Sequence, residues 1–296
     1  MNSSRPLQGK RIGIFGKGGS GKSTVTVLLA EALCAMAYEI CVLDADSTNM
    51  GLHRAFGLQK TPSSLIDFFG GCVFYGGSVS CPVDDPTHLP EAEISLEELP
   101  PAYFAQSREG LYLLTAGKLG KRGPGAGCDG PVAKIARDLR LSIGRERPVT
   151  LIDFKAGLED SARGVLTSLD WALVVVDPNS ASIQVAVDLR EAIEGIRRGE
   201  LPATAHLRSS SLVKLANQIY QNARIKNMLV VINRIRNQRA ADLVTRRLEQ
   251  SGITPTGVIH EDPEISSAWL EGTKIENSNT CISDVTKALE NEGSKE

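Results

Sequence analysis

The chain has 296 residues, of which 42% are hydrophobic, so it is long enough to bury the core of one large α/β domain. Its formal net charge of −2 excludes an overall basic field of the kind that draws proteins onto DNA or anionic lipid, although a local patch stays open. No apolar run approaches the length of a membrane span, and six scattered cysteines without an export signal read as reduced thiols. We therefore expect a cytoplasmic protein that makes no contact with a membrane.

Residues 16–24 form a phosphate-binding loop between an apolar strand and an Ala- and Leu-rich helix. The pattern is Gly-x-x-x-x-Gly-Lys-Ser, in which backbone N–H groups and the helix N-terminus close on phosphate oxygens. Lys22 is expected to reach the β- and γ-phosphates, and Ser23 to ligate Mg²⁺. The predicted nucleotide-binding residues of the loop are Gly16, Lys17, Gly18, Gly19, Ser20, Gly21, Lys22, Ser23 and Thr24.

Short apolar runs alternate with helical patterns along the chain, and most contain β-branched residues. This alternation predicts an α/β fold, with a mostly parallel twisted sheet, helices on both faces and one P-loop NTPase domain over residues 1–296. The expected strands are Arg11 to Phe15, Glu39 to Leu43, Leu111 to Thr115, Val149 to Asp153, Trp171 to Val176, Met228 to Ile232 and Thr256 to His260.

The connection 51–110 departs from this rhythm, with a short helix expected at 63–69 followed by glycine pairs and a proline- and acid-rich stretch. Connections of this length are commonly functional or mobile. An elaborated surface with an additional edge hairpin is the alternative, and both interpretations stay open.

Carboxylates follow two of the expected strands. Asp44 and Asp46 end the second strand, where one carboxylate is expected to orient the loop while Asp46 positions the water that attacks the γ-phosphate. Asp153 ends an apolar strand in the form of a Walker B element and is expected to hold Mg²⁺ with Ser23. Residues 154–164 read as the second nucleotide-sensing loop, switch II.

The early lysine of the loop, Lys17, gives it the form Lys-Gly-Gly-x-Gly-Lys-Ser-Thr, which resembles the deviant Walker A ATPases, the nitrogenase iron protein, septum-positioning and plasmid-partition proteins among them. The resemblance implies an ATP-dependent homodimer in which Lys17 crosses to the partner's nucleotide, so that Lys17, Lys22 and Asp46 are the catalytic residues. It also implies that Asn233 and Arg234 read adenine, and that the 260–264 loop with Pro263 closes over the base.

A narrower resemblance is to the accessory ATPases that insert nickel into carbon monoxide dehydrogenase, carried by residues 153–164 and 173–183. Those proteins use a Cys-x-Cys pair, whereas this chain has only Cys128 in the comparable loop. The loop also resembles the first cluster loop of the nitrogenase iron protein, but no cysteine stands between Cys128 and Cys281 to supply the second ligand. Cys128 is therefore open as a soft-metal ligand facing its symmetry mate, helped by Asp129 or Asp160, or as a small residue in a tight turn.

Three functions follow from these resemblances. The first is an ATP-hydrolysing dimeric switch that uses ATP and Mg²⁺, assists a client metalloprotein, and carries a transition metal or iron–sulfur cluster at the dimer interface. The second is a partition or positioning ATPase that acts on DNA or another surface; charge runs on helices are commonly only solvated faces, so nucleic acid has little support. The third is an ATP-dependent iron–sulfur electron donor. The basic group behind the second is Arg234, Arg236, Arg239, Arg246 and Arg247.

Overall fold

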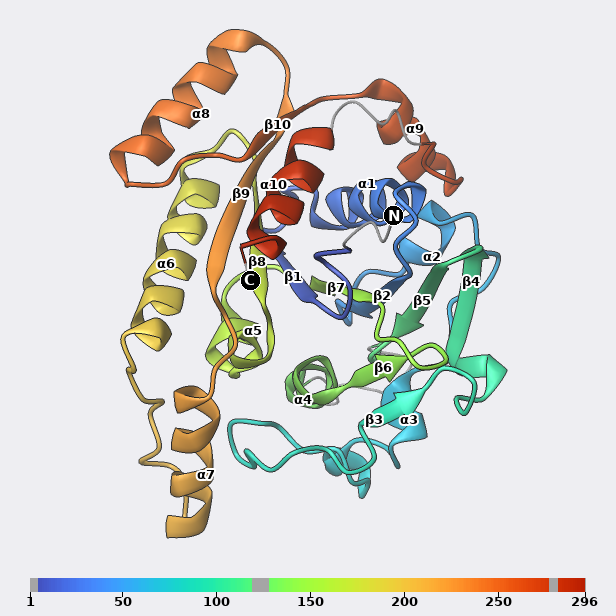
Figure 1. Cartoon of the computed structure of the whole chain (residues 1–296), viewed down its shortest axis with the longest axis vertical. Helices are drawn as coiled ribbons and strands as arrows, with labels where there is room; N and C mark the ends of the chain where they lie inside the picture. The colour runs from blue at the N-terminus through green and yellow to red at the C-terminus, as the bar shows by residue number, and fades with distance from the viewer. Residues whose placement is uncertain (1–4, 119–127, 277–281, 296) are drawn as a thin grey trace.

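The computed structural model describes residues 5–118, 128–276 and 282–295, and its centre is one twisted sheet (Figure 1). The strands in this sheet are β1 (Arg11–Gly16), β2 (Ile40–Ala45), β4 (Phe104–Arg108), β5 (Leu111–Thr115), β7 (Val149–Phe154), β8 (Trp171–Val176), β9 (Asn227–Ile235) and β10 (Gly257–His260). Their order is β10-β9-β8-β1-β7-β2-β5-β4, and all pairs are parallel except β4 with β5. The α/β prediction is confirmed, and all seven predicted strands take part.

The connection 51–110 supplies the parts of the fold that the apolar pattern missed. β4 is antiparallel to β5 and forms the edge hairpin that the sequence left open. A separate parallel pair joins β3 (Glu93–Ser95) to β6 (Arg140–Ser142), and neither strand was predicted. The short helix expected at 63–69 is present as α3 (Leu65–Phe68). The connection is thus an ordered layer that folds over the sheet edge.

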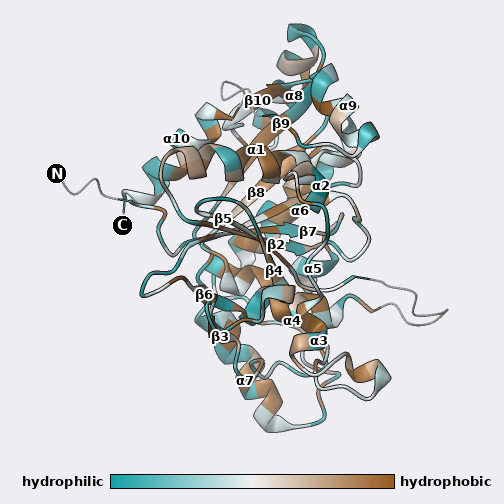
Figure 2. Cartoon of the chain, turned by 90° about the vertical axis from the view of Figure 1, so that its right-hand side faces the viewer, coloured by the Kyte–Doolittle hydropathy of each residue, from teal (hydrophilic) through white to brown (hydrophobic). Residues whose placement is uncertain are grey.

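Helices cover both faces of the sheet. They are α1 (Lys22–Ala35), α2 (Leu52–Ala55), α3, α4 (Gly130–Asp138), α5 (Glu159–Ala162), α6 (Ser180–Arg197), α7 (Ser210–Gln221), α8 (Gln238–Gln250), α9 (Pro263–Glu271) and α10 (Ser283–Gly293), with 3₁₀ turns η1 (Val73–Tyr75), η2 (Pro101–Tyr103) and η3 (Val165–Ser168). Figure 2 shows the apolar strands in the middle of the molecule, with α1 and α10 on one side and α3 and α4 on the other. No helix in the described ranges combines the length and the apolar character that crossing a membrane requires.

The core divides into two apolar clusters because alternate side chains of a strand point to opposite faces. In β1, Ile12 and Ile14 join the cluster under α1 and α10, whereas Phe15 joins the cluster under α4 and α6 and stacks on Phe154 at 4.6 Å between ring centroids. Burial on both faces explains the continuous apolar strands. It also fixes the register that brings the strand ends to one edge.

Local capping sets where three of the helices begin. The side chain of Asn179 accepts from the Ser182 N–H at the start of α6, and Asn237 accepts from Ala240 at the start of α8. Asp262 does the same for α9 with the Glu264 N–H, and Pro263 occupies the first turn. Such caps satisfy backbone donors that have no partner inside the helix. The Asp262 cap and Pro263 therefore fix where α9 begins, and this point lies beside the candidate site.

Helix α4 holds the connection 51–110 in place. Its Lys134 is buried and pairs with Asp85 at 2.8 Å, while also donating to the Ser80 hydroxyl at 2.7 Å. The buried Arg137 donates to the Thr87 carbonyl at 2.9 Å and pairs with the neighbouring Asp138. Buried charges are stable only when they are paired and hydrogen-bonded, so these contacts fix the 80–87 segment on α4.

Candidate nucleotide-binding site

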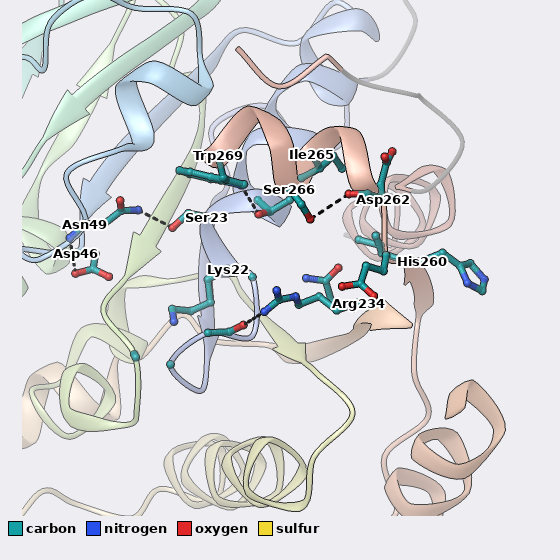
Figure 3. Close-up of a pocket in the computed structure, with 18 of the residues that line it drawn as sticks. Lys22, Ser23, Asp46, Asn49, Arg234, His260, Asp262, Ile265, Ser266 and Trp269 are labelled. Carbon is teal, nitrogen blue, oxygen red and sulfur yellow. Dashed lines mark hydrogen bonds between the residues drawn. The ribbon is translucent and has the colours of Figure 1, made fainter. Parts of the chain in front are cut away.

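A cavity of about 570 Å³ opens at the carboxyl edge of the sheet, where a topological switch in strand order favours ligand binding (Figure 3). The phosphate loop, the loop after β2, the end of β9 and the 259–269 segment line it. The predicted residues in its lining are Gly18, Gly19, Gly21, Lys22, Ser23, Thr24, Asp46, Asn233 and Arg234. Gly16, Lys17, Ser20, Asp153 and Pro263 are not among the lining residues.

The glycines of the loop are required by close backbone approach. Gly21 has a φ of 95°, and a Cβ there would lie 2.2 Å from the amide nitrogen of Asn233. Gly16 has a φ of 147°, and a Cβ there would lie 2.5 Å from the Val175 carbonyl oxygen. Other residues strain at such φ values, so only glycine lets the loop turn from β1 into α1. The loop is thus shaped by β8 and β9 as well as by its own sequence.

The two lysines of the loop have different surroundings. Lys22 is 7% exposed, and its ammonium donates to the Lys17 carbonyl at 3.3 Å. Burial lowers the pKa of Lys22, an effect opposed by the charges of Asp153 and Asp46. Lys17 is half-buried, and within the described residues its ammonium donates only to the Gly18 carbonyl, at 3.4 Å. Lys22 therefore points into the cavity of its own chain, whereas Lys17 lies outside that cavity.

Ser23 lines the cavity, and Asp153 lies buried behind it. The Ser23 hydroxyl donates to Asp153 Oδ2 at 2.6 Å and accepts from the Asn49 amide at 2.8 Å. Asp153 is fully buried, and its Oδ1 has no hydrogen-bond partner in the described part of the chain. Burial raises the pKa of Asp153 to about 6, although Ser23 and Lys22 act in the opposite direction. An orphaned buried carboxylate oxygen beside a serine hydroxyl fits the oxygen ligands that Mg²⁺ prefers.

Asp46 caps the loop that follows β2. Its Oδ1 accepts from the Thr48 N–H at 2.9 Å and from the Thr48 hydroxyl at 2.7 Å, and the side chain borders the cavity across from Arg234 (Figure 3). These bonds fix one carboxylate oxygen on the loop while the side chain borders the same cavity as Lys22. This position suits a group that orients water, and that role stays a prediction.

Lys118 is a residue of the site that the sequence reasoning missed. Its ammonium pairs with Asp44 at 2.6 Å and donates to the Asp46 carbonyl at 2.6 Å and to the Asn49 carbonyl. Burial raises the pKa of Asp44 to about 7, and the charge of Lys118 opposes this. Because Lys118 joins the Asp44 carboxylate to the loop after β2, Asp44 is the carboxylate that can orient this loop, and that role stays a prediction. A polar residue close to the end of β5 was the available signal for Lys118.

β9 and α9 form the side of the cavity across from Asp46. Asn233 is buried and its amide donates to the Ser20 carbonyl at 2.8 Å, while Arg234 donates to the Gly19 carbonyl at 2.9 Å. The Trp269 indole donates to the Thr24 hydroxyl at 2.9 Å. In Figure 3, Trp269, Ile265 and Ser266 lie along α9 above the loop. Pro263 begins α9 outside the cavity lining, so its neighbours Asp262 and Ile265, rather than Pro263, border that space.

Part of the basic group has partners. Arg234 contacts the phosphate loop, and Arg236 pairs with Glu261 at 2.6 Å. Arg234 therefore lines the cavity, and Arg236 is held next to it by Glu261, which is also a lining residue.

The segment around Cys128 lies beside switch II. The half-buried thiol of Cys128 accepts from the Gly130 N–H at 3.3 Å. The two carboxylates expected to help it already have partners, since Asp129 pairs with Lys155 at 2.7 Å and Asp160 with Arg163 at 2.9 Å. Within residues 5–118, 128–276 and 282–295, no group of three or more His, Cys, Asp or Glu side chains is placed to hold a metal ion.

The pKa values of the two carboxylates beside Cys128 are shifted in opposite directions. Burial acts to raise the pKa of Asp129, but the hydrogen bonds from Lys155 and Ser47 outweigh it, and the pKa lies below its ordinary value. Burial raises the pKa of Asp160 to about 6 in spite of Arg163. Asp129 is thus an ionised bridge between the loop after β2, which carries Ser47, and switch II, which carries Lys155.

Comparison with known proteins places this geometry in a family. Residues 14–275 match the model described as the CobQ/CobB/MinD/ParA nucleotide binding domain. An uncharacterized ATP-binding protein of Methanocaldococcus jannaschii is 26% identical over 281 residues, covering 94% of this chain and 99% of that protein. The carbon monoxide dehydrogenase accessory protein CooC of Rhodospirillum rubrum is 28% identical over 202 residues, covering 64% of this chain and 69% of CooC.

The solved structures agree on the fold. The septum site-determining protein MinD of Pyrococcus horikoshii, in complex with Mg-ADP, has a TM-score of 0.56 at 16% identity and is covered over 95% of both chains. The family model and the similarity to CooC confirm the resemblance to MinD/ParA-like ATPases and to the carbon monoxide dehydrogenase accessory proteins. Because the family model spans most of the chain and the phosphate loop borders the cavity, the chain belongs to the CobQ/CobB/MinD/ParA nucleotide-binding family, as a MinD/ParA-like P-loop protein related to CooC.

Proposed function

We propose that the protein is an ATP-hydrolysing dimeric switch that assists metal insertion or maturation of a client metalloenzyme. The observation that carries the proposal is the different position of the two loop lysines relative to the cavity. Lys22 is buried and borders its own cavity, whereas Lys17 is half-buried outside that cavity and bonds only to the neighbouring Gly18 carbonyl among the described residues. A dimer that closes over ATP gives Lys17 a phosphate to contact in the partner's cavity.

Within one chain the cavity supplies the groups that phosphoryl transfer needs. Lys22 neutralises the β- and γ-phosphates, the loop N–H groups hold their oxygens, and Asp46 orients the water that attacks the γ-phosphorus. The bond from that phosphorus to the ADP oxygen breaks, giving ADP and phosphate. Ser23 and Asp153 would hold Mg²⁺, which supplies charge neutralisation when bound. Asn233, at the end of β9, would read the adenine edge.

The metal-related half of the proposal rests on relatives and on Cys128. CooC is named as an accessory protein of carbon monoxide dehydrogenase, and this chain is similar to it over 202 residues. Cys128 presents a half-buried thiol next to Asp129, whose carboxylate bonds to Ser47 and Lys155 from both loops that border the nucleotide. A ligand placed there would respond to nucleotide binding and release. The client would therefore receive metal at a defined step of the ATP cycle.

Sedimentation velocity with a nonhydrolysable ATP analogue tests the switch. Wild type should dimerise with the analogue and hydrolyse ATP, while Lys17→Ala should bind nucleotide but stay monomeric and hydrolyse ATP at least about tenfold more slowly. Lys60→Ala changes an exposed lysine outside the cavity and serves as the matched control. A wild-type protein that stays monomeric and inactive with MgATP would refute the switch.

A separate measurement tests the maturation role. Anaerobic wild type should bind a thiophilic ion and release it to a thiolate acceptor peptide at a rate that differs between ATP- and ADP-bound protein. Metal retention that is the same with either nucleotide would refute the maturation role while leaving the ATPase intact.

A further inference from the structure

A second thiol lies beside Cys128, although the two cysteines are far apart in sequence. Cys81 comes from the connection 51–110 and is 8% exposed. A Cβ added to Gly130 would lie 2.6 Å from the Cys81 sulfur, and the Gly130 N–H itself donates to the Cys128 sulfur at 3.3 Å. Both sulfurs therefore contact the same residue, the first of α4. Any larger residue in place of Gly130 would displace the Cys81 thiol.

The two thiols share one rigid support. Lys134 of α4 donates to Ser80 Oγ at 2.7 Å and pairs with Asp85 at 2.8 Å, so the residues on both sides of Cys81 are tied to the helix. The Asp85 N–H also donates to the Cys81 carbonyl at 2.9 Å, which closes the turn that carries the thiol. Cys128 lies two residues before Gly130, the first residue of the same helix. The pair is thus held by α4 rather than by two independent loops.

We propose that Cys81 and Cys128 of one chain form a two-thiolate site for a thiophilic metal ion of the Zn²⁺, Ni²⁺ or Cu⁺ class. This inference rests on the proposed maturation role and names its ligand set. Thiolate sulfur selects ions of that class, and two sulfurs from one chain leave coordination positions open. A client thiolate or water can fill those positions, so the ion binds without being locked in place. Such a half-complete site suits transfer to a client.

The surroundings of the thiol pair connect it to the nucleotide. Asp129, next to Cys128, accepts hydrogen bonds from Ser47 and from Lys155, which lie in the two loops at the carboxyl edge. On the Cys81 side, a cavity of about 290 Å³ is lined by Pro82 and Val83 together with Arg163 and Gly164 at the end of switch II. A movement of switch II therefore reaches both halves of the site.

Anaerobic titration of the full-length, phosphine-reduced protein with Co²⁺ and then Zn²⁺ tests the site. The thiolate-to-cobalt charge-transfer absorption should saturate at one ion per chain without nucleotide. Cys81→Ser and Cys128→Ser should each weaken binding by at least about tenfold, because metal affinity depends on every sulfur ligand. Cys72→Ser, a buried cysteine of the same connection, is the matched control and should bind as wild type does.

Two further variants keep the test decisive. Cys81→Ala replaces Cys81→Ser if the serine variant has a lowered melting temperature. Gly130→Ala keeps both thiols but displaces the Cys81 sulfur. Gly130→Ala should weaken Co²⁺ binding without changing the number of titratable thiols. One ion per two chains, lost only in Cys128→Ser, would overturn the intrachain pair and leave the maturation role standing. Absence of thiolate–cobalt absorption in wild type would overturn the pair, while wild-type ATP hydrolysis and dimerisation would still report on the switch.

Discussion

The nucleotide cavity and the layer formed by the connection 51–110 with α4 are built in different ways. The cavity is made of short motifs at strand ends, whose side chains meet because parallel strands end at one edge. The connection is held by single long-range contacts, such as Lys134 with Asp85 and Arg137 with the Thr87 carbonyl. Sequence motifs identify the first region, whereas the second depends on pairings that only the folded chain reveals. Mutations should therefore separate the two regions cleanly.

The largest effect is expected in the cavity. Lys22→Ala should lower ATP hydrolysis by at least about a hundredfold and weaken nucleotide binding, since no other side chain of the loop replaces its charge. Equilibrium binding of a fluorescent ATP analogue measures this, with Lys60→Ala as the control. Unchanged affinity would mean that the phosphates do not lie on this loop.

Asp46→Asn should separate binding from hydrolysis. Asparagine keeps an oxygen that can accept from Thr48, so the loop should keep its shape while the carboxylate that orients water is lost. We expect hydrolysis to fall by about a hundredfold and the ATP-bound dimer to accumulate. Phosphate release and sedimentation report the two quantities, and Asp188→Asn on α6 is the control. Normal turnover would remove Asp46 from the reaction.

In the second region, Lys134→Met should cost stability rather than nucleotide binding. It leaves Asp85 and Ser80 without their buried partner, and because Asp85 is partly exposed we expect about 2 kcal/mol less unfolding free energy. Urea unfolding measures this, with the exposed Lys214→Met on α7 as the control. Hydrogen exchange should increase first in residues 80–87. A loss of nucleotide affinity as large as the loss of stability would show that the two regions act as one.

The last expected effect concerns Asp44, whose contribution to stability depends on pH. Its folded pKa of about 7 lies above the ordinary value of 3.8, so the folded chain holds a proton that the unfolded chain releases. The stability that Asp44 contributes is complete below about pH 4 and is lost as the pH rises to about 7. The unfolding free energy of wild type minus that of Asp44→Asn should fall with rising pH, at most about 1.4 kcal/mol per pH unit. A difference that stays constant over this range would contradict the raised pKa.

The sequence predicted the regular parts of the molecule because their signals are local. All seven strands and the phosphate loop follow from apolar runs and strand-end residues, and Ser23 and Asp153, both expected to hold Mg²⁺, lie within hydrogen-bond distance of each other. It did not predict α4, a helix of nine residues that follows a Gly- and Pro-rich segment and buries its charged side chains Lys134 and Arg137 as well as its apolar ones. It also missed Lys118 and Cys81, whose partners lie in distant segments. Asp129 and Asp160 were expected beside a metal, but each already pairs with a basic side chain.

The contacts of β9 with the phosphate loop have a consequence for the order of events in binding. Asn233 and Arg234 donate to the Ser20 and Gly19 carbonyls, so the end of β9 and the phosphate loop are joined as one part of the fold. A ligand then loses little free energy to reorganising the protein. We therefore expect adenosine and a polyphosphate each to bind on its own, because neither has to organise the side of the cavity that the other occupies.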